Sequence, residues 1–275
     1  MTACVRGIGI LLSFCLLCGF APGAEKRDRS FYEKTGDIVW EVPMEARKIA
    51  LTFDDGPYPE TTGDILDLLK KYDGKATFFV VGHRAEEAPE LVRRELAEGH
   101  EIGNHTYTHL FLKKSVNPQT VFDEINRTEE TLTRLTGAKP TLFRPPGGYY
   151  NDPLIELTKK LGYQTVLWSW HQDTKDWRSP GVAAIANKVL TNARAGDIVL
   201  LHDCVQGSTQ TVQALRIILP ELSRRGFRFV TVSELLRDRA RLEGGEASGV
   251  RDADVGGDAN GDSNRDALPV PQPTP

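Results

Sequence analysis

The chain has 275 residues, enough for one large domain with a full hydrophobic core. Its formal net charge is −4, and residues 241–275 carry all of it, with three arginines and seven acids (3 − 7 = −4). The other residues are balanced at 31 basic (34 − 3) and 31 acidic (38 − 7) side chains. The chain therefore lacks the basic field that is typical of nucleic-acid-binding proteins.

The first residues have the composition of a secretory signal peptide. Arg6 supplies a positive charge, the apolar run 8–20 is short for a membrane span, and small residues follow at 21–24. We therefore expect residues 1–24 to be a signal peptide and the protein to be exported to the periplasm, the cell wall or the extracellular space. An uncleaved membrane anchor is one alternative. Lipidation of Cys18 is another, although Leu17 stands where a small residue would be expected.

Cysteine is scarce in the rest of the chain. Cys4, Cys15 and Cys18 would leave with the signal peptide, so Cys204 alone would remain. We expect no internal disulfide, and the core must then supply the stability. Cys204 lies two residues after His202, but we interpret it as a small packed residue rather than as a nucleophile.

After a lead-in at residues 25–46, apolar runs alternate with helical patterns. The apolar runs have the length of buried strands, at 49–53, 76–81, 100–103, 141–143, 164–168, 197–201 and 227–232. The helical patterns lie between them, at 61–72, 89–98, 118–135, 153–161, 182–193 and 209–225. Asn117 is expected to cap the third helix. This alternation predicts a parallel sheet with helices outside it, either open or closed into a barrel.

Residues 241–275 have too few apolar side chains to fold, so we expect a disordered tail after a domain at 47–240. The aspartates and asparagines at 258–266 have a spacing similar to that of calcium loops. However, Ser263 stands where such a loop needs glycine, and Pro269 stands where it needs the closing acid.

Charged and imidazole side chains follow the carboxyl ends of five predicted strands. In open and closed parallel sheets alike, these ends share one rim, where functional residues gather. The candidates are Asp54, Asp55, His105, His109, Arg144, Asp173, Asp176 and His202. We expect these groups to converge on one site.

The segment GNHTYTH (103–109) holds His105 and His109 in a sequence that disfavours a helix, so we place both in the loop beyond a strand. Two imidazoles and one carboxylate, with room for water, is the usual composition of a catalytic zinc site. Mg²⁺ prefers oxygen ligands and would not call for two histidines. Adjacent side chains diverge along a strand, so one of Asp54 and Asp55 should bind metal while the other is left for proton transfer.

Five motifs occur in this order along the chain: TFDDG (52–56), HTYTH (105–109), RPPGG (144–148), DTKDW (173–177) and LLHD (200–203). Together they resemble the motifs of the polysaccharide deacetylases, the NodB-type enzymes of carbohydrate esterase family 4. The resemblance covers roughly residues 47–238. It implies a single catalytic domain with a distorted (β/α)7 barrel.

The resemblance also implies a metal-dependent hydrolase that removes acetyl groups from N-acetylglucosamine units of a peptidoglycan or chitin-like glycan. The metal would be Zn²⁺, with Co²⁺ or another transition metal as the alternative, and we expect a monomer. Asp55, His105 and His109 would hold the metal. Asp54 would be the catalytic base and His202 the general acid.

Further roles follow from the same resemblance. Arg144 and Asp173 would form a charged pair that supports the base and the acid, although Asp176 is close enough in sequence to replace Asp173. Leu200 and Trp177 would line the pocket for the acetyl methyl group.

One position departs from the family pattern. Gly147 stands where many members of the family have tyrosine or phenylalanine. A backbone N–H near Gly147 would still bind the oxyanion. The aromatic wall of the substrate groove would be lost, unless Tyr149 or Tyr150 supplies it.

Two other functions are compatible with these motifs. An O-acetyl esterase acting on xylan could use the same site, because ester and amide carbonyls have the same geometry. An inactive carbohydrate-binding relative would be expected to have lost a metal ligand or the acid, and this chain keeps them all.

Overall fold

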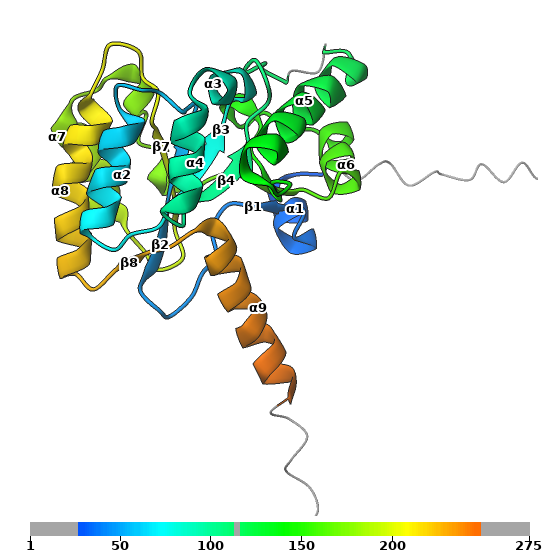
Figure 1. Cartoon of the computed structure of the whole chain (residues 1–275). Coiled ribbons are helices and arrows are strands. Elements are labelled where there is room, and N and C mark those ends of the chain that lie inside the picture. Colours follow the sequence, from blue (N-terminus) through cyan, green and yellow to red (C-terminus); the bar gives the residue numbers. More distant parts are fainter. Residues whose placement is uncertain (1–26, 113–115, 249–275) are drawn as a thin grey trace, which may run out of the picture.

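The computed structural model describes residues 27–112 and 116–248, so the predicted signal peptide lies outside the described residues (Figure 1). Within these ranges, parallel strands form one sheet in the order β1-β6-β5-β4-β3-β2-β7, with β8 paired beside β2. The strands are β1 (Ile38–Val39), β2 (Lys48–Asp54), β3 (Thr77–Val80), β4 (Glu101–Asn104), β5 (Leu142–Phe143), β6 (Gln164–Val166), β7 (Ile198–His202) and β8 (Arg228–Phe229).

The predicted strands are present as β2 to β8, and β1 is an addition from the lead-in. Ile38 and Val39 pair in parallel with Thr165 and Val166 of β6, far along the chain. The expectation that the lead-in lies outside the domain is therefore wrong for β1, because its backbone completes one edge of the sheet.

Loops rather than paired strands connect the two edges of the sheet. The N–H of Val42, after β1, donates to the carbonyl of Gly196, before β7, at 2.9 Å. Beside this bond, Glu41 and Asp197 form an isolated antiparallel bridge. The sheet is therefore curled into a half-barrel, and the predicted distorted barrel of strands and helices is confirmed in this form.

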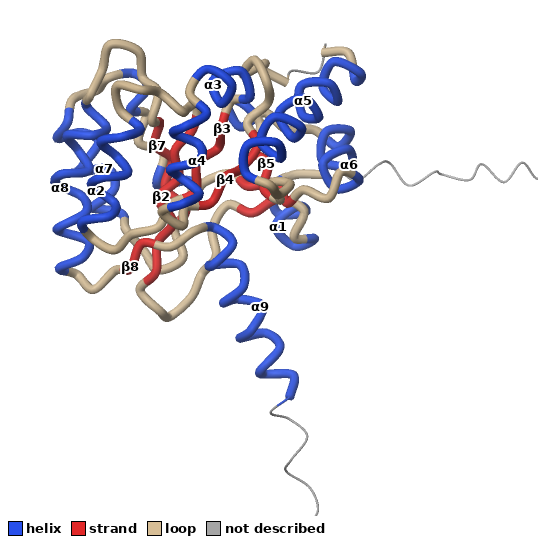
Figure 2. Tube along the Cα trace, viewed as in Figure 1, coloured by secondary structure: helices blue, strands red, loops and turns tan. Residues whose placement is uncertain are grey.

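Helices surround the sheet, with α2, α7 and α8 on one side and α5 and α6 on the other (Figure 2). The side chain of Asn117 accepts a hydrogen bond from the N–H of Gln119, so the predicted cap of α5 is confirmed. Short 3-10 helices occupy loops at Pro146–Gly148, Trp170–Gln172 and Asp176–Arg178. The α-helices are α1 (Arg29–Thr35), α2 (Thr62–Lys71), α3 (Gly82–Glu87), α4 (Pro89–Ala97), α5 (Pro118–Thr136), α6 (Asp152–Lys160), α7 (Val182–Asn192), α8 (Gln210–Arg224) and α9 (Val232–Ser248).

The largest core cluster lies between the central strands and their covering helices. Phe53 of β2 stacks on Phe78 of β3 with ring centroids 5.1 Å apart, and Leu66 of α2 and Leu215 of α8 are fully buried in the same cluster. Burial of each such side chain is worth about 1.5–3 kcal/mol. This packing fixes β2, whose carboxyl end carries Asp54.

Helix α9 extends away from the body of the domain (Figure 1). Its first half is anchored by the buried side chain of Leu235 and by Lys48, which pairs with Glu234 at 2.8 Å and with Asp238. Adding residues to a formed helix costs little, and the helix continues through residues 241–248. The prediction of a disordered tail is therefore wrong for those residues, and residues 249–275 lie outside the described ranges.

Among the helices of the described residues, none is both long and apolar enough to cross a bilayer.

Candidate active site

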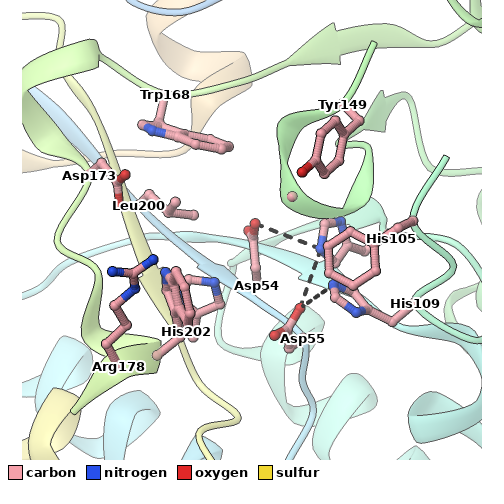
Figure 3. Close-up of a pocket in the computed structure, with 13 residues that line it drawn as sticks. Asp54, Asp55, His105, His109, Tyr149, Trp168, Asp173, Arg178, Leu200 and His202 are labelled. Carbon is pink, nitrogen blue, oxygen red and sulfur yellow. Dashed lines mark ion pairs between the residues drawn. The ribbon is translucent and has the colours of Figure 1, made fainter. Parts of the chain in front are cut away.

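A cavity of about 440 Å³ opens at the carboxyl ends of the strands (Figure 3). Ten of the candidates named from the sequence line this cavity: Asp54, Asp55, His105, His109, Gly147, Tyr149, Asp173, Trp177, Leu200 and His202. Two other candidates, Arg144 and Asp176, are buried and do not line it. The cavity wall also contains Phe111, Trp168 and Arg178, which the sequence did not suggest.

Asp54 and Asp55 point to different partners because the strand ends between them. Asp54 is the last residue of β2, and Asp55 has a φ of 79°, in the left-handed region. A non-glycine residue costs about 1–3 kcal/mol in such a conformation. Oδ1 of Asp54 accepts a hydrogen bond from Arg144 at 2.7 Å, whereas Oδ1 of Asp55 lies 3.1 Å from Nε2 of His109.

The turn after Asp55 is braced by the end of β7. A Cβ atom at Gly56 would lie 1.9 Å from Oδ2 of Asp203, so only glycine fits there. The same carboxylate oxygen accepts a hydrogen bond from the hydroxyl of Thr62 at 2.6 Å. Burial raises the pKa of Asp203 to about 7, against the opposing effect of Thr62. Asp203 therefore shapes the turn that presents Asp55.

The loop that carries the two histidines is held by α5. The N–H groups of Tyr107 and Thr108 donate to Oε2 of Glu124 at 2.9 and 2.8 Å. Thr106 and His109 have φ values of 66° and 58°, so the four-residue spacing is not a helical turn. As at Asp55, this backbone is strained, and such strain collects at functional sites.

The two histidines and Asp55 converge on one point. Nδ1 of His105 lies 2.7 Å from the backbone carbonyl oxygen of Arg144. Because a carbonyl oxygen can only accept a hydrogen bond, Nδ1 of His105 carries the proton. Nε2 of His105 then presents a lone pair to Oδ1 of Asp55 at 3.4 Å. That oxygen is buried without a hydrogen-bond donor. Acceptors facing one another across such a gap fit a cation between them.

The spacing of these donors also fits a metal ion. The ligand atoms of Asp55, His105 and His109 all lie within 4.8 Å of one another. Tetrahedral zinc ligands at their usual bond lengths are about 3.4 Å apart. Burial alone would raise the pKa of Asp55, but the imidazoles of His105 and His109, whenever they carry a proton on Nε2, and the more distant His202 hold it well below its usual range. The carboxylate is therefore ionised and available as a ligand at neutral pH.

His202 lies on the other side of the cavity, next to Asp54 in the register of β7 and β2. Its Nδ1 lies 2.6 Å from Oδ1 of Asp176, whose other oxygen accepts from the backbone N–H of His202 and from the hydroxyl of Thr211, both at 2.8 Å. Burial lowers the pKa of His202, but the buried carboxylate of Asp176 outweighs it and raises the pKa to about 9. The imidazole is therefore protonated at neutral pH.

The charged pair expected between Arg144 and Asp173 is absent among the described contacts, so that prediction is wrong. Arg144 instead donates to Asp54 and to the hydroxyl of Thr52, at 2.7 and 2.8 Å. Asp173 pairs with Leu200 through a backbone bridge, and its side chain stays at the cavity wall. The following turn then carries Asp176, the alternative candidate, under His202.

An aromatic rim surrounds the mouth of the cavity. Gly147 has a φ of 65°, and a Cβ atom there would lie 2.8 Å from the ring of Phe111 and 3.0 Å from that of Tyr149. Phe111 and Tyr149 are 46% and 49% exposed, with ring centroids 6.1 Å apart. The space that a side chain at position 147 would need is therefore filled by two other rings. Tyr149 was a candidate for this wall, whereas Phe111 was missed because nothing in its sequence context separates it from a core residue.

Two other histidines that could be considered for the site have structural partners. Nδ1 of His83 lies 2.8 Å from the carbonyl oxygen of Tyr107, and Nε2 of His171 lies 2.9 Å from Oδ1 of Asp197. Neither residue lines the cavity. The histidines that line the cavity are therefore His105, His109 and His202.

Comparison with known proteins gives glycan deacetylases among the relatives. Residues 41–166 match the family model described as polysaccharide deacetylase. The chain is 52% identical over 209 residues to a peptidoglycan-N-acetylglucosamine deacetylase of Bacillus cereus, in a match that covers 76% of this chain and 97% of the relative. It is 40% identical over 201 residues to a chitooligosaccharide deacetylase of Bradyrhizobium sp., covering 69% of this chain and 90% of the relative.

Solved structures share the fold. The Bc1960 peptidoglycan N-acetylglucosamine deacetylase, in complex with 4-naphthalen-1-yl-N-oxidanyl-benzamide, superposes with a TM-score of 0.69 and 38% sequence identity. The superposition covers 74% of this chain and 94% of that chain. The peptidoglycan deacetylase PdaC of Bacillus subtilis gives a TM-score of 0.67 at 38% identity, covering 74% of this chain and 96% of that chain.

Proposed function

The chain belongs to the polysaccharide deacetylase family, and from this premise we propose that it hydrolyses the N-acetyl group of N-acetylglucosamine units in peptidoglycan, releasing acetate. The name of the Bacillus cereus relative supports this choice of substrate. The observation that carries the proposal is the division of the cavity. Asp55, His105 and His109 converge on one side of the cavity, and His202 faces them from the other (Figure 3). Oδ1 of Asp176 lies 2.6 Å from Nδ1 of His202.

We propose that Asp55, His105 and His109 hold Zn²⁺. Two nitrogen donors and one oxygen donor suit zinc better than they suit a hard ion, and Co²⁺ suits the same set. When bound, the metal would polarise the acetyl carbonyl and lower the pKa of a water molecule beside it. The hydrogen bond from Nδ1 of His105 to the Arg144 carbonyl holds Nε2 in the direction that this role needs.

Asp54 is the proposed base that takes the proton of the attacking water. Its Oδ1 is held by Arg144 at 2.7 Å, which fixes the plane of the carboxylate. Its Oδ2 lies 3.8 Å from Nε2 of His105, so this oxygen faces the space beside the metal ligands. Arg144 acts through Asp54 and is a positioning residue. The general base and the metal ligands are thus different groups, as proton transfer beside a bound metal requires.

His202 is the proposed acid that protonates the leaving nitrogen of the sugar. Its Nδ1 is engaged by Asp176, so Nε2 is the nitrogen that can reach the substrate. Asp176 is 1% exposed and keeps the imidazole charged near neutral pH. A charged donor is the form that can give a proton to the amine as the C–N bond breaks.

The walls of the cavity suit an acetylated sugar. Leu200 and Trp177 would receive the acetyl methyl group, and the backbone N–H of Gly147 would stabilise the oxyanion. Phe111 and Tyr149 would contact the apolar face of the sugar ring. Because these groups lie on β7 and on the loops after β4, β5 and β6, the half-barrel itself sets their spacing.

Acetate release from peptidoglycan, chitooligosaccharides and acetylxylan, measured in parallel with the zinc-loaded protein, tests the proposal. We expect the highest kcat/KM on peptidoglycan, and His202→Ala should reduce release from every substrate. Release from acetylxylan alone would replace the proposal with an O-acetyl esterase. No release from any of the three would end the proposal of a hydrolase acting on these glycans.

We also propose that the protein works outside the cytoplasmic membrane, as a monomer. The signal-like composition of residues 1–24 supports export, and peptidoglycan lies in that compartment. Fractionation of cells that express the full chain, followed by size-exclusion chromatography, tests both statements. Recovery of the active protein in the cytoplasm, or as a stable dimer, would contradict them.

A further inference from the structure

A second hollow, of about 500 Å³, adjoins the active-site cavity. The two hollows share Gly147, Trp168 and Asp173 in their linings, so they lie side by side, and together we call them the groove. A glycan whose acetylated unit occupies the first cavity would place a neighbouring unit in the second. The residues that line only the second hollow include no proposed metal ligand, base or acid. They can therefore determine which substrate binds without taking part in the reaction.

Aromatic rings supply the floor and rim of the second hollow. Trp170 is 82% exposed, the highest exposure of any large apolar side chain described. Trp40 and Tyr150 lie deeper, with ring centroids 5.9 Å apart. An indole ring left in water is unfavourable unless something covers it, and exposed apolar surface inside a groove is typical of ligand sites.

The polar lining of the second hollow is basic. Lys175 and Lys188 both line it, and no carboxylate of the described residues lies within 4.0 Å of either ammonium group. Arg29 also lines it, but Arg29 is paired with Glu33 at 2.6 Å. Asp173 is the acid of this lining. Two unpaired ammonium groups beside one carboxylate leave a net positive charge that an anion can neutralise.

We infer that the second hollow binds a carboxylate-bearing substituent on the sugar next to the one that is deacetylated, as in the peptide-substituted muramic acid of peptidoglycan. Lys175 and Lys188 would contact the carboxylate, and Trp170 would cover the apolar face of the sugar. This inference rests on the proposed function and narrows it, because chitin-like glycans carry no carboxylates. It also explains why unpaired lysines border an otherwise aromatic groove.

Binding can be measured apart from catalysis. Calorimetric titration of the metal-free protein would compare three glucosaminyl-muramic acid probes: one with a free lactyl carboxylate, one with a dipeptide, and one with the amidated, neutral dipeptide. We expect a carboxylate probe to bind roughly fivefold more tightly than the neutral probe, since two exposed ion pairs are worth about that much. Whichever carboxylate binds more tightly, lactyl or peptide, is the one that the lysines contact.

Variants decide whether the lysines are responsible. Lys175→Gln with Lys188→Gln should bring the ratio of carboxylate to neutral affinity to about one. Lys70→Gln with Lys160→Gln removes the same charge outside both hollows and should keep the ratio. Trp170→Ala should weaken all three probes alike. Equal melting temperatures would show that the variants are folded.

Two results would overturn the inference: a wild-type ratio of one, or a ratio that survives loss of both lysines in the groove. Acetate release is not part of this measurement. A protein that binds as expected but releases no acetate would therefore contradict only the proposed function.

Discussion

Nδ1 of His202 lies 2.6 Å from Oδ1 of Asp176, a side chain that is fully enclosed between β7 and α8. Burial lowers the pKa of the imidazole, but this carboxylate raises it by more, to about 9. The acid must be protonated to act, so the rate of deacetylation should fall as the pH rises through about 9. Above that pH, kcat should fall ~tenfold for each pH unit. Measurement of kcat between pH 6 and 10.5, in buffers of constant ionic strength, checks this prediction.

Asp176→Asn should move that descending limb to lower pH. Without the carboxylate, the strongest of the effects that oppose burial is lost, so the pKa of His202 should fall. The matched control is Asp173→Asn, which removes a carboxylate from the cavity wall without touching His202. We expect kcat of the control to fall at the same pH as kcat of the wild type, whatever its absolute rate. If this pH shifts in Asp173→Asn but not in Asp176→Asn, then Asp173 rather than Asp176 raises the pKa of His202.

The same contact should make the stability of the fold depend on pH. The folded pKa of about 9 lies above the ordinary value of 6.5, so the stabilisation is fully present below pH 6.5. It is lost as the pH rises through about 9. Urea denaturation of the wild type and of Asp176→Asn at pH 6 and pH 10 checks this. We expect the difference in unfolding free energy between the two proteins to shrink at the higher pH.

Asp54 and Asp55 should separate metal binding from turnover. Asp54→Asn leaves the donor set of Asp55, His105 and His109 complete, so it should retain zinc while losing about 10²- to 10⁴-fold in kcat. Asp55→Asn and His105→Ala should lose both metal and rate, with partial rescue by added zinc. Zinc content, measured by atomic emission, and acetate release should be determined for each variant. If Asp54→Asn loses zinc and Asp55→Asn keeps it, then Asp54 is the metal ligand and Asp55 is the base.

The strand ends and the residues on them could be predicted because they depend on local patterns. Asp54, His105 and His202 each follow or end an apolar run, and parallel strands bring such ends to one rim. The contact between His202 and Asp176 could not be assigned, because it depends on a turn in which Lys175 has a φ of 52°. The motif favoured Asp173, with Asp176 as the alternative, and the folded turn shows that Asp176 is the residue that contacts His202.

Other features were missed because they depend on contacts between distant segments. β1 is two residues long and has no periodicity of its own, and it exists as a strand because β6 pairs with it. Phe111 joins the rim of the cavity through its contacts with Tyr149 and His109, which no spacing along the chain reveals. Both cases show tertiary context deciding what local sequence leaves open.

Zinc should stabilise the protein as well as activate it. Asp55, Thr106 and His109 have left-handed backbones, and a metal bound by Asp55, His105 and His109 would tie the two strained segments together. Zinc at about 100 times its Kd should add about 2.7 kcal/mol to the unfolding free energy. Thermal melts with and without zinc, after removal of metal by a chelator, measure this. His109→Ala is the control and should show a much smaller shift.

The close contact between Gly56 and Asp203 should make this glycine irreplaceable. Gly56→Ala would place a Cβ atom 1.9 Å from Oδ2 of Asp203, so the turn must move and we expect a loss of about 1–3 kcal/mol together with weaker zinc binding. Gly63→Ala in α2 is the matched control. Its nearest neighbour would be Arg94 at 3.7 Å, and it should be neutral or stabilising by up to about 1 kcal/mol. Equal stability of the two variants in urea would contradict the role of Asp203 as a brace.

The contacts of helix α9 determine how far the chain can be shortened from its C-terminus without loss of activity. Leu235 is fully buried, and Lys48 contacts Glu234 and Asp238, so the anchoring part of α9 ends before residue 240. A chain that ends at Ala240 should therefore keep full activity and melt within about 2 °C of the full chain. A chain that ends at Thr231 loses the fully buried side chains of Val232 and Leu235 and should be destabilised by about 3–6 kcal/mol. Melting curves and acetate release for both truncations test this, and a loss of several degrees in the longer one would show that residues beyond 240 pack against the domain.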